Sequence, residues 1–588
     1  MITWLSRFES ATLSTWSHDS RRLTKLGASK NPDAFSSSLG SLAYKPPPSK
    51  PIKDRKFLVR DWTPWLGWNN VRYTIETGLL IANLLGRELV LPGFTYATGC
   101  DFDDEVCAKL TPMFVHGVPV DLSTVSNRSQ YPDPDEGTNI LSPLLPSQNW
   151  KGWVLPLDVM LDLPYLQFNW NSSISLPEFL QLTSPGTKHA SLLGQSSGKW
   201  SEHNNNGLSY RKIANAKFTN FSTTVLDRLP LPVEPLIPKD DTNVTLSSSI
   251  PLKVIQKCQA TLQKVDQLQP RFRQKRDSSK PAQDLTSFPS WNDDLIQGDQ
   301  MTGELSHHDN DLLERCIASH GYRTAYGYTL DGWWMKAPYG PTKYFRKVET
   351  MIGWWDELHA YDESILHIEG ELHNGFPPGS MLWTTLEGRQ NFEKLVRTAM
   401  RPPDLYDRVA AKLEKRMRER CQGRAWRAGH MRRGDFIAYQ WTAKNITKQY
   451  DRIESNINAS VALLKSETGL LSPAHKAYDT SLEAPRTEDP FYLATNVRSK
   501  EEIAFLRTKN VVLLNDLLDE TDKADLGFSA PFTDTLAIVE QCLIMRSAFF
   551  YGDGHSSVAG WILNRRNFFG IDEKLTKIEY LKQPGDGQ

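Results

Sequence analysis

The segment "RAGHMRRGDF", Arg427–Phe436, joins an apolar strand pattern to a cluster of charged residues directly behind it. The run "RAWRAGH" (Arg424–His430) predicts a β-strand, and the strand delivers His430, Arg432 and Arg433 at its carboxyl end. A solvated turn is the simplest explanation of two adjacent arginines. The pattern of the surrounding chain is therefore needed to decide between a turn and a site.

Strand and helix patterns alternate on both sides of this segment. Before it, apolar residues recur every four positions from Leu405 to Met417, which predicts a helix after the interruption "RPPD". After it come, in order, a strand "FYLAT", a helix opened by the capping box Ser499/Glu502, a strand "NVVLLN", a helix Asp534–Ser547, a strand "AFFYG" and a helix from Ser556. Such alternation predicts a parallel α/β sheet with helices on both faces, whose ligands bind at the carboxyl ends of the strands.

A similar unit opens the folded part of the chain. The pattern predicts a strand at Lys56–Arg60, a loop at Asp61–Asn70, a helix at Val71–Leu85 and a second strand at Arg87–Pro92. The loop carries Gly67, Trp68, Asn69 and Asn70 behind the first strand. The two ends of the folded chain are thus both expected to be α/β.

The length of 588 residues exceeds what one hydrophobic core holds and predicts more than one domain. Residues 1–54 are polar and Ser-rich and end in "KPPPSKP", which predicts a disordered segment with a Pro-rich linker. We expect a first folded domain over 55–400, with polar insertions at about 186–311, and a second over 401–588.

The charge balance argues against a polyanionic partner. Lys and Arg number 68 and Asp and Glu 69, so no global basic field exists to gather nucleic acid, and we expect no direct membrane contact from this chain. The N-terminus contains no apolar run long enough for a signal peptide or anchor, so either the chain is soluble or an anchor is missing.

Two further patterns leave alternatives open. Cys100 and Cys107 are close enough in sequence to close a small loop if oxidised, although buried free thiols fit equally well. In "ILHIEGELH" (Ile365–His373), the side chains on one strand face suit either metal ligation or, as we prefer, an exposed sheet face. These side chains are His367, Glu369, Glu371 and His373.

Three predicted strand ends carry polar groups, and the two in the second half suggest a diphosphate site. An arginine fork at Arg432 matches phosphate geometry, and Ser556 and Ser557 begin a helix whose first N–H groups favour an anion. An ordinary serine N-cap is the plain alternative. Glu540 lies in the apolar run "AIVEQCLIM", where a carboxylate needs either a buried partner with N–H donors or solvent.

Three motifs resemble those of the GDP-fucose-dependent fucosyltransferases, most closely the protein O-fucosyltransferases. "GHMRRGDF" resembles their H-x-R-R-G-D-[FWY] signature, and "FYGDGHSSVAGWI" (Phe550–Ile562) resembles their later donor motif. "WLGWNNVRYTIETGLLIANLLGRELVLP" (Trp65–Pro92) resembles their N-terminal Gly-x-Asn loop, long helix and strand. The motifs occur in the family's order in both halves and leave residues 1–54 and the polar insertions unmatched.

The resemblance implies a glycosyltransferase of GT-B type, with two Rossmann-like domains whose parallel sheets face each other across a cleft. The implied reaction is inverting transfer of fucose from GDP-fucose to a hydroxyl acceptor, a protein Ser or Thr, in the ER or Golgi lumen. No cofactor or metal is implied. The Asp-x-Asp tripeptides at Asp101 and Asp133 occur about as often as chance predicts in a chain this rich in Asp.

The resemblance also implies roles for single residues. Arg432 and Asn69 would be catalytic, with Arg432 holding the β-phosphate of departing GDP, while Arg433 and Asp435 would brace the loop. The implied donor-binding residues are Gly67, Asn69, His430, Arg432, Glu540, Ser556 and Ser557, with His430 and Glu540 at the guanine. Leu66 stands where some relatives have an acceptor-activating Glu. Alternatives are a glycan acceptor, another nucleotide-sugar, or a non-catalytic sugar-nucleotide or glycan-binding protein.

Overall fold

The computed structural model describes most of the predicted folded regions, all within one compact unit, residues 48–588. The described residues are 54–62, 66–115, 118–119, 151–170, 172–183, 207–214, 224–227, 258, 296–297, 300–302, 307–328, 341–369, 381–466, 482–571 and 573–579. The predicted disordered segment lies outside them except for Asp54, and so do Asp133 and most of the insertion at 186–311.

A five-stranded parallel sheet forms the core of the second half. The alternating pattern predicted four of its strands but not the last, Thr576–Glu579. Its spatial order is β18-β17-β16-β19-β20, which is the 3-2-1-4-5 order of a doubly wound sheet. The strands are β16 (Arg427–Met431), β17 (Phe491–Thr495), β18 (Val511–Val512), β19 (Phe549–Asp553) and β20 (Thr576–Glu579).

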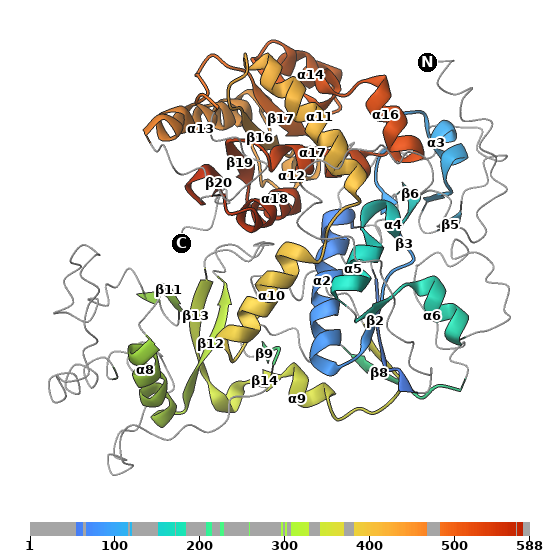
Figure 1. Ribbon diagram of the computed structural model, residues 1–588, viewed down its shortest axis with the longest axis vertical. Helices are drawn as coiled ribbons and strands as arrows, with labels where there is room; N and C mark the ends of the chain where they lie inside the picture. Colours follow the sequence, from blue (N-terminus) through green and yellow to red (C-terminus); the bar gives the residue numbers. More distant parts are fainter. Residues whose placement is uncertain are drawn as a thin grey trace. The chain divides into compact units, whose positions relative to one another are not determined.

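Helices cover both faces of this sheet (Figure 1). Side chains of alternating strand residues enter two separate cores, with Ala428 and Phe550 in one and Phe549 and Tyr551 in the other. The helices are α11 (Asp404–Arg420), α12 (Asp435–Ala438), α13 (Ile446–Ser466), α14 (Lys500–Arg507), α15 (Leu514–Leu517), α16 (Glu520–Leu526), α17 (Thr533–Ile544) and α18 (Ser557–Phe568). The capping serine Ser499 precedes α14 as predicted and accepts from the backbone N–H of Glu502.

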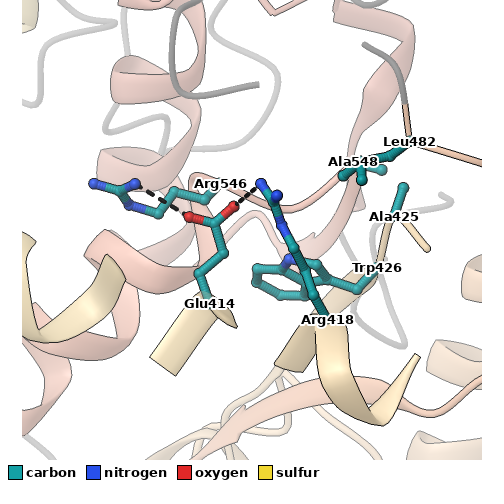
Figure 2. Close-up of a pocket in the computed structure, with 7 residues that line it drawn as sticks. All are labelled: Glu414, Arg418, Ala425, Trp426, Leu482, Arg546 and Ala548. Atoms are coloured by element: carbon teal, nitrogen blue, oxygen red, sulfur yellow. Dashed lines mark hydrogen bonds and ion pairs between the residues drawn. The ribbon is translucent and has the colours of Figure 1, made fainter. Parts of the chain in front are cut away.

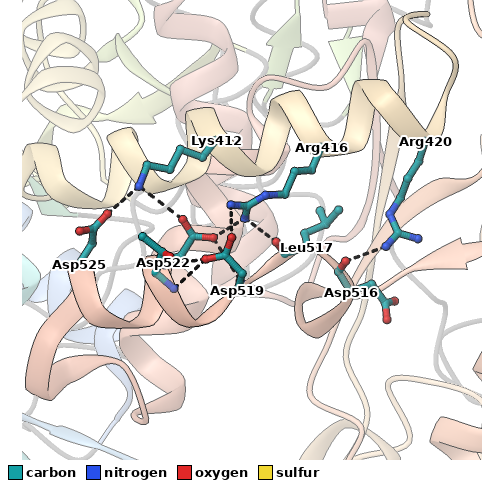
Figure 3. A network of polar contacts seen from close by, with 9 residues as sticks. Lys412, Arg416, Arg420, Asp516, Leu517, Asp519, Asp522 and Asp525 are labelled. Carbon is teal, nitrogen blue, oxygen red and sulfur yellow. Dashed lines mark hydrogen bonds and ion pairs between the residues drawn. The ribbon is translucent and has the colours of Figure 1, made fainter. Parts of the chain in front are cut away.

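Charged side chains join α11 to the segment that contains α16 (Figure 3). Lys412 Nζ lies 2.6 Å from Asp525 Oδ2, and Arg416 Nη2 lies 2.6 Å from Asp519 Oδ2. Arg416 also pairs with Asp522, whose side chain is fully buried. A buried carboxylate needs such a partner, so this network fixes α16 on α11 and has a structural explanation.

The first half contains a second five-stranded parallel sheet, in the order β7-β2-β1-β15-β8. Its strands are β1 (Phe57–Arg60), β2 (Glu88–Val90), β7 (Ser173–Ile174), β8 (Tyr210–Ala214) and β15 (Ile365–Glu369), and α2 (Trp68–Leu85) joins β1 to β2. The predicted β-loop-α-β unit is confirmed. The insertion was predicted too broadly, because β8 lies within it and forms an edge strand whose polar sequence hides its backbone pairing with β15.

Two antiparallel four-stranded sheets and a two-stranded pair accompany this half, and the sequence patterns did not predict them. Their strands are β3 (Phe94–Ala97), β4 (Met113–Val115), β5 (Val118–Pro119), β6 (Lys151–Pro156), β9 (Thr224–Val225), β10 (Ile296–Gln297), β11 (Gln300–Thr302), β12 (Tyr322–Tyr328), β13 (Pro341–Lys347) and β14 (Ile352–Gly353). The helices here are α3 (Asp104–Leu110), α4 (Leu157–Met160), α5 (Leu163–Asn169), α6 (Leu176–Thr183), α8 (His307–Ser319), α9 (Trp354–Leu358) and α10 (Leu386–Thr398). No helix in the described ranges is long and apolar enough to cross a membrane.

Disulfides connect Cys100 with Cys107 and Cys258 with Cys316, while Cys421 and Cys542 are buried free thiols. Oxidation of Cys100 and Cys107 is thus the alternative that the structure adopts. Within the described part of the chain, the group with metal-ligand spacing is Cys258, Cys316 and His320. Two of its three members are disulfide-bonded, so this group offers no thiolate pair.

The exposed-face interpretation of "ILHIEGELH" is wrong for its first member. His367 is buried, with Nδ1 2.8 Å from the Tyr210 hydroxyl and Nε2 2.9 Å from Asp61 Oδ1. Glu369 forms an ion pair with Lys212. The neighbouring strand β8 supplies two of these partners, which is why the strand pattern alone could not predict them. Glu371 and His373 lie outside the described residues.

Candidate functional site

The sheet order of the second half creates one position where a ligand site is favoured. Strand β16 has β17 on one side and β19 on the other, so the chain leaves the carboxyl ends of β16 and β19 in opposite directions. Doubly wound sheets bind ligands at this switch point. The structure brings the segment after β16 and the segment after β19 to this edge, and these segments contain two of the three motifs.

Arg433 is held from all sides by the protein itself. Its side chain is 3% exposed, and its guanidinium pairs with Glu502 at 2.6 Å. It also donates to Gln449 Oε1 at 2.9 Å and to the Lys444 carbonyl oxygen at 2.8 Å. A guanidinium so occupied has little capacity left for a ligand.

Arg432, the adjacent residue, has a different environment. Its side chain is 35% exposed, and its Nε donates to Asp435 Oδ1 at 2.9 Å. Its guanidinium carbon lies 5.9 Å from the centre of the Phe436 ring. Asp435 and Phe436 therefore orient a cation that remains accessible at the carboxyl edge of the sheet.

His430 lies in β16 and is buried, yet its Nδ1 has no hydrogen-bond partner among the described residues. Its pKa is lowered to about 4, mainly by burial and also by the positive charge of Arg432, while Asp553 acts in the opposite direction. The ring is therefore neutral at physiological pH. An unpaired nitrogen in a buried neutral ring is a group that a ligand can satisfy.

Asp553 ends β19 and His555 precedes α18, and neither was among the predicted site residues. Both lie at the same edge of the sheet as His430 and Arg432. Asp553 Oδ1 accepts from the His555 backbone N–H at 2.9 Å and lies 3.1 Å from the ring Nδ1. The His555 ring stacks on Trp441, with centres 5.2 Å apart and planes 13° apart. The sequence signal was the spacing in "DGHSS", where an Asp two residues before a His precedes a helix.

Ser556 and Ser557 stand at the start of α18. Ser556 is its buried N-cap residue, but its side chain makes no capping hydrogen bond, and the first turn contains no acidic residue. Ser557 is half-buried and opens the helix. The first-turn N–H groups thus lack a side-chain cap, which leaves the anion-binding character of this helix end intact.

The Gly67 loop of the first half meets the same region. Gly67 has a φ of 75°, which a glycine adopts without strain, and Asn69 behind it is buried with no partner for Oδ1 in the described chain. The Tyr73 hydroxyl donates to the Ser557 carbonyl oxygen at 3.2 Å. The start of α2 therefore lies beside the start of α18, and half-buried Leu66 lies in the same loop.

Glu540 lies within α17 and is engaged by an interior residue. Its Oε1 accepts from the Tyr492 hydroxyl at 2.7 Å. The Glu540 pKa is raised to about 7, mainly by desolvation; Asp101 also raises it, and the hydrogen bond from Tyr492 acts in the opposite direction. The partner of this carboxylate is therefore a tyrosine on strand β17, which the local sequence of α17 could not reveal.

Figure 2 shows a small pocket in the second half of the chain. Trp426 and Ala548 on its wall directly precede β16 and β19, which places the pocket at the amino edge of the sheet. Glu414 on its wall bridges Arg418 and Arg546. The candidate site lies at the carboxyl edge, so the pocket is distinct from it. Its lining residues are Glu414, Arg418, Ala425, Trp426, Leu482, Arg546 and Ala548.

Comparisons with known proteins add no family assignment. No protein-family model and no curated protein sequence matches the chain. Among solved structures, it is similar to POFUT1 in complex with GDP, at 9% identity and a TM-score of 0.30, over 90% of this chain and 99% of that one. It is also similar to NodZ alpha-1,6-fucosyltransferase soaked with GDP-fucose, at 11% identity and a TM-score of 0.18, over 35% and 52% of the two chains. Likenesses this weak establish neither fold nor activity.

Proposed function

We propose that this protein is a fucosyltransferase that transfers fucose from GDP-fucose to a hydroxyl acceptor. One observation carries the proposal: the two motifs that resemble donor motifs of this enzyme family lie at the carboxyl ends of β16 and β19. These motifs are far apart in sequence, and the switch point of a doubly wound sheet is where they would have to meet.

In the proposed donor complex, the partly exposed Arg432 forms a bidentate contact with the β-phosphate and offsets the charge on departing GDP. Ser556, Ser557 and the N-terminus of α18 contact the phosphates. The unpaired Nδ1 of His430 and the Glu540 carboxylate face the guanine. Arg433 and Asp435 hold the loop, in keeping with their contacts inside the protein.

The acceptor side of the proposal rests on the first half. The contact between Tyr73 and Ser557 supports a reaction centre between α2 and α18, with Asn69 beside the acceptor hydroxyl in a cleft between the halves. We propose inverting transfer to a protein Ser or Thr without a metal ion. The two disulfides fit an oxidising compartment such as the ER or Golgi lumen.

Calorimetric titration of the full chain with GDP, UDP and ADP, in EDTA, tests the donor assignment. We expect GDP to bind at least tenfold more tightly than UDP or ADP, because His430 and Glu540 would contact guanine alone. The Arg432→Ala variant should lose most of this binding. Binding that requires manganese, or equal affinity for all three nucleotides, would contradict the proposal.

A non-catalytic sugar-nucleotide or glycan-binding protein is the second candidate. It is favoured by Leu66, which stands where some relatives place an acceptor-activating Glu. Hydrolysis of GDP-fucose separates the two, since a transferase without acceptor still releases fucose slowly and a binding protein does not. An array of glycan and peptide acceptors then distinguishes protein from glycan fucosylation, and alternative donors test the sugar.

A further inference from the structure

Resting on the proposed donor site, we propose that His555, held by Asp553, contacts the diphosphate through its ring as a second protein group beside Arg432. Asp553 and His555 lie within the motif Phe550–Ile562, but the sequence assigned no role to either. His555 directly precedes Ser556, the N-cap residue of the 12-residue helix α18. A phosphate bound at that helix end would lie within reach of this ring.

The Asp553 carboxylate orients the His555 ring. Its Oδ1 lies 3.1 Å from Nδ1, so Nδ1 donates to Asp553 and a ligand contact would go through Nε2. In the proposed complex, Nε2 donates to a phosphate oxygen, and the ring then carries a hydrogen on both nitrogens. A helix N-terminus alone does not require a paired Asp and His beside it. The Asp553 backbone carbonyl already accepts from Ser556 N–H, and this contact would close the turn without the imidazole.

A continuous set of aromatic rings joins His555 to Arg432. The Arg432 guanidinium lies over Phe436, the Phe436 ring meets Trp441 edge-on at 5.1 Å, and Trp441 stacks on His555. Both side chains therefore rest on one aromatic cluster, although they follow different strands. Such a cluster holds two polar groups at a set separation, which suits the two phosphates of a diphosphate.

A second, independent observation points to a ligand here. His430 is buried beside these residues, and its Nδ1 has no partner among the described residues. Strands β16 and β19 pair with Gly429 opposite Tyr551, so His430 and Asp553 lie on neighbouring strands at the edge from which Arg432 emerges. The helix end is thus one part of a larger polar site with an unsatisfied buried group.

The test compares ligands that differ only in phosphate content. GDP, GMP and guanosine are titrated into wild-type protein and the His555→Ala, His555→Gln and Asp553→Asn variants. We expect His555→Ala to weaken GDP binding by roughly tenfold or more and GMP by less, while guanosine affinity stays within about twofold. Asp553→Asn should reduce GDP affinity by several-fold in the same selective way.

His359 provides a matched control, because it is an exposed histidine that also stacks on a tryptophan, with its ring 3.8 Å from that of Trp355. His359→Ala should leave all three affinities unchanged. Equal losses for GDP and guanosine in His555→Gln, accompanied by a lower Tm, would show a purely structural role and overturn the inference. Unchanged GDP affinity would overturn it as well. Absence of GDP binding to wild-type protein would instead remove the proposed function on which the inference rests.

Discussion

Asp534, in the first turn of α17, accepts a hydrogen bond from the backbone N–H of Trp68, the first residue of α2, at 3.3 Å. Its other carboxylate oxygen accepts from the backbone N–H of Thr98 at 2.8 Å and from the Thr98 hydroxyl at 3.1 Å. One side chain of the second half thus satisfies N–H groups in two loops of the first. This contact fixes the Gly67 loop beside the proposed donor site.

Replacement of Asp534 by Ala should therefore loosen the Gly67 loop. We expect the free energy of unfolding to fall by about 1–3 kcal/mol, because hydrogen bonds to a charged group are lost. Transfer activity should fall by more than GDP affinity does, since the loop belongs to the acceptor side. Denaturant unfolding and kinetics on the same variant measure both quantities.

Glu520→Ala is the control for this change, because Glu520 forms an exposed ion pair with Lys523 on the neighbouring helix α16. Its effect on unfolding should stay within about 0.5 kcal/mol. If Asp534→Ala behaved like this control, the contact with Trp68 would not hold the loop.

The adjacent arginines should respond oppositely to the same substitution. Arg432→Lys keeps the charge and loses the bidentate fork, so turnover should drop roughly a hundredfold or more with little change in stability. Arg433→Lys breaks a buried network with Glu502 and Gln449, so stability should fall by about 2 kcal/mol. Thermal unfolding and GDP-fucose turnover of both variants test this division; near-normal turnover in Arg432→Lys would refute the assigned role.

Stability should depend on pH through Glu540. Its pKa is about 7 in the folded protein against 4.5 for an ordinary Glu, so between these values the folded state holds a proton that the unfolded chain has released. Unfolding free energy contributed by this group therefore falls as pH rises from about 4.5 to 7. Glu540→Gln lacks this titrating group. Its stability relative to wild type should therefore rise by about 3 kcal/mol between pH 4.5 and pH 8.

The wild-type protein has a second group of this kind, buried Glu76 on α2, whose pKa burial also raises to about 7. The total pH dependence thus includes both carboxylates, and the difference between Glu540→Gln and wild type isolates one. Parallel stability curves for the two proteins across this pH range would contradict the shifted pKa.

The disulfide between Cys100 and Cys107 should stabilise the loop that docks on the start of α17. Thr533 N–H donates to the Gly99 carbonyl oxygen at 2.9 Å, and Asp101 N–H donates to that of Pro531 at 2.8 Å. A Cys100→Ser, Cys107→Ser double variant should lose about 2 kcal/mol in unfolding free energy. Reduction of wild-type protein should lower stability at least as much; an unchanged double variant would show that the loop is held without its disulfide.

Local patterns in the sequence were sufficient for four of the five strands in the parallel sheet of the second half, all but β20. The periodicities of helix and strand and the capping serine of α14 depend on near neighbours along the chain, so they can be read without the fold. These local patterns also predicted that Arg432 and Ser556 follow the ends of strands. They did not predict β8, because a polar edge strand is defined by its partner β15 rather than by its own composition.

The tertiary structure alone decided which of two adjacent arginines is buried and which is accessible, since the partners of Arg433 come from three separate later segments. It alone gave Glu540 its tyrosine and set His555 on Trp441. These contacts join residues far apart in the chain, and only the packing of complete elements determines them. The sequence by itself determined where polar groups emerge from the sheet; the fold decided which of them are satisfied by the protein and which can serve a ligand.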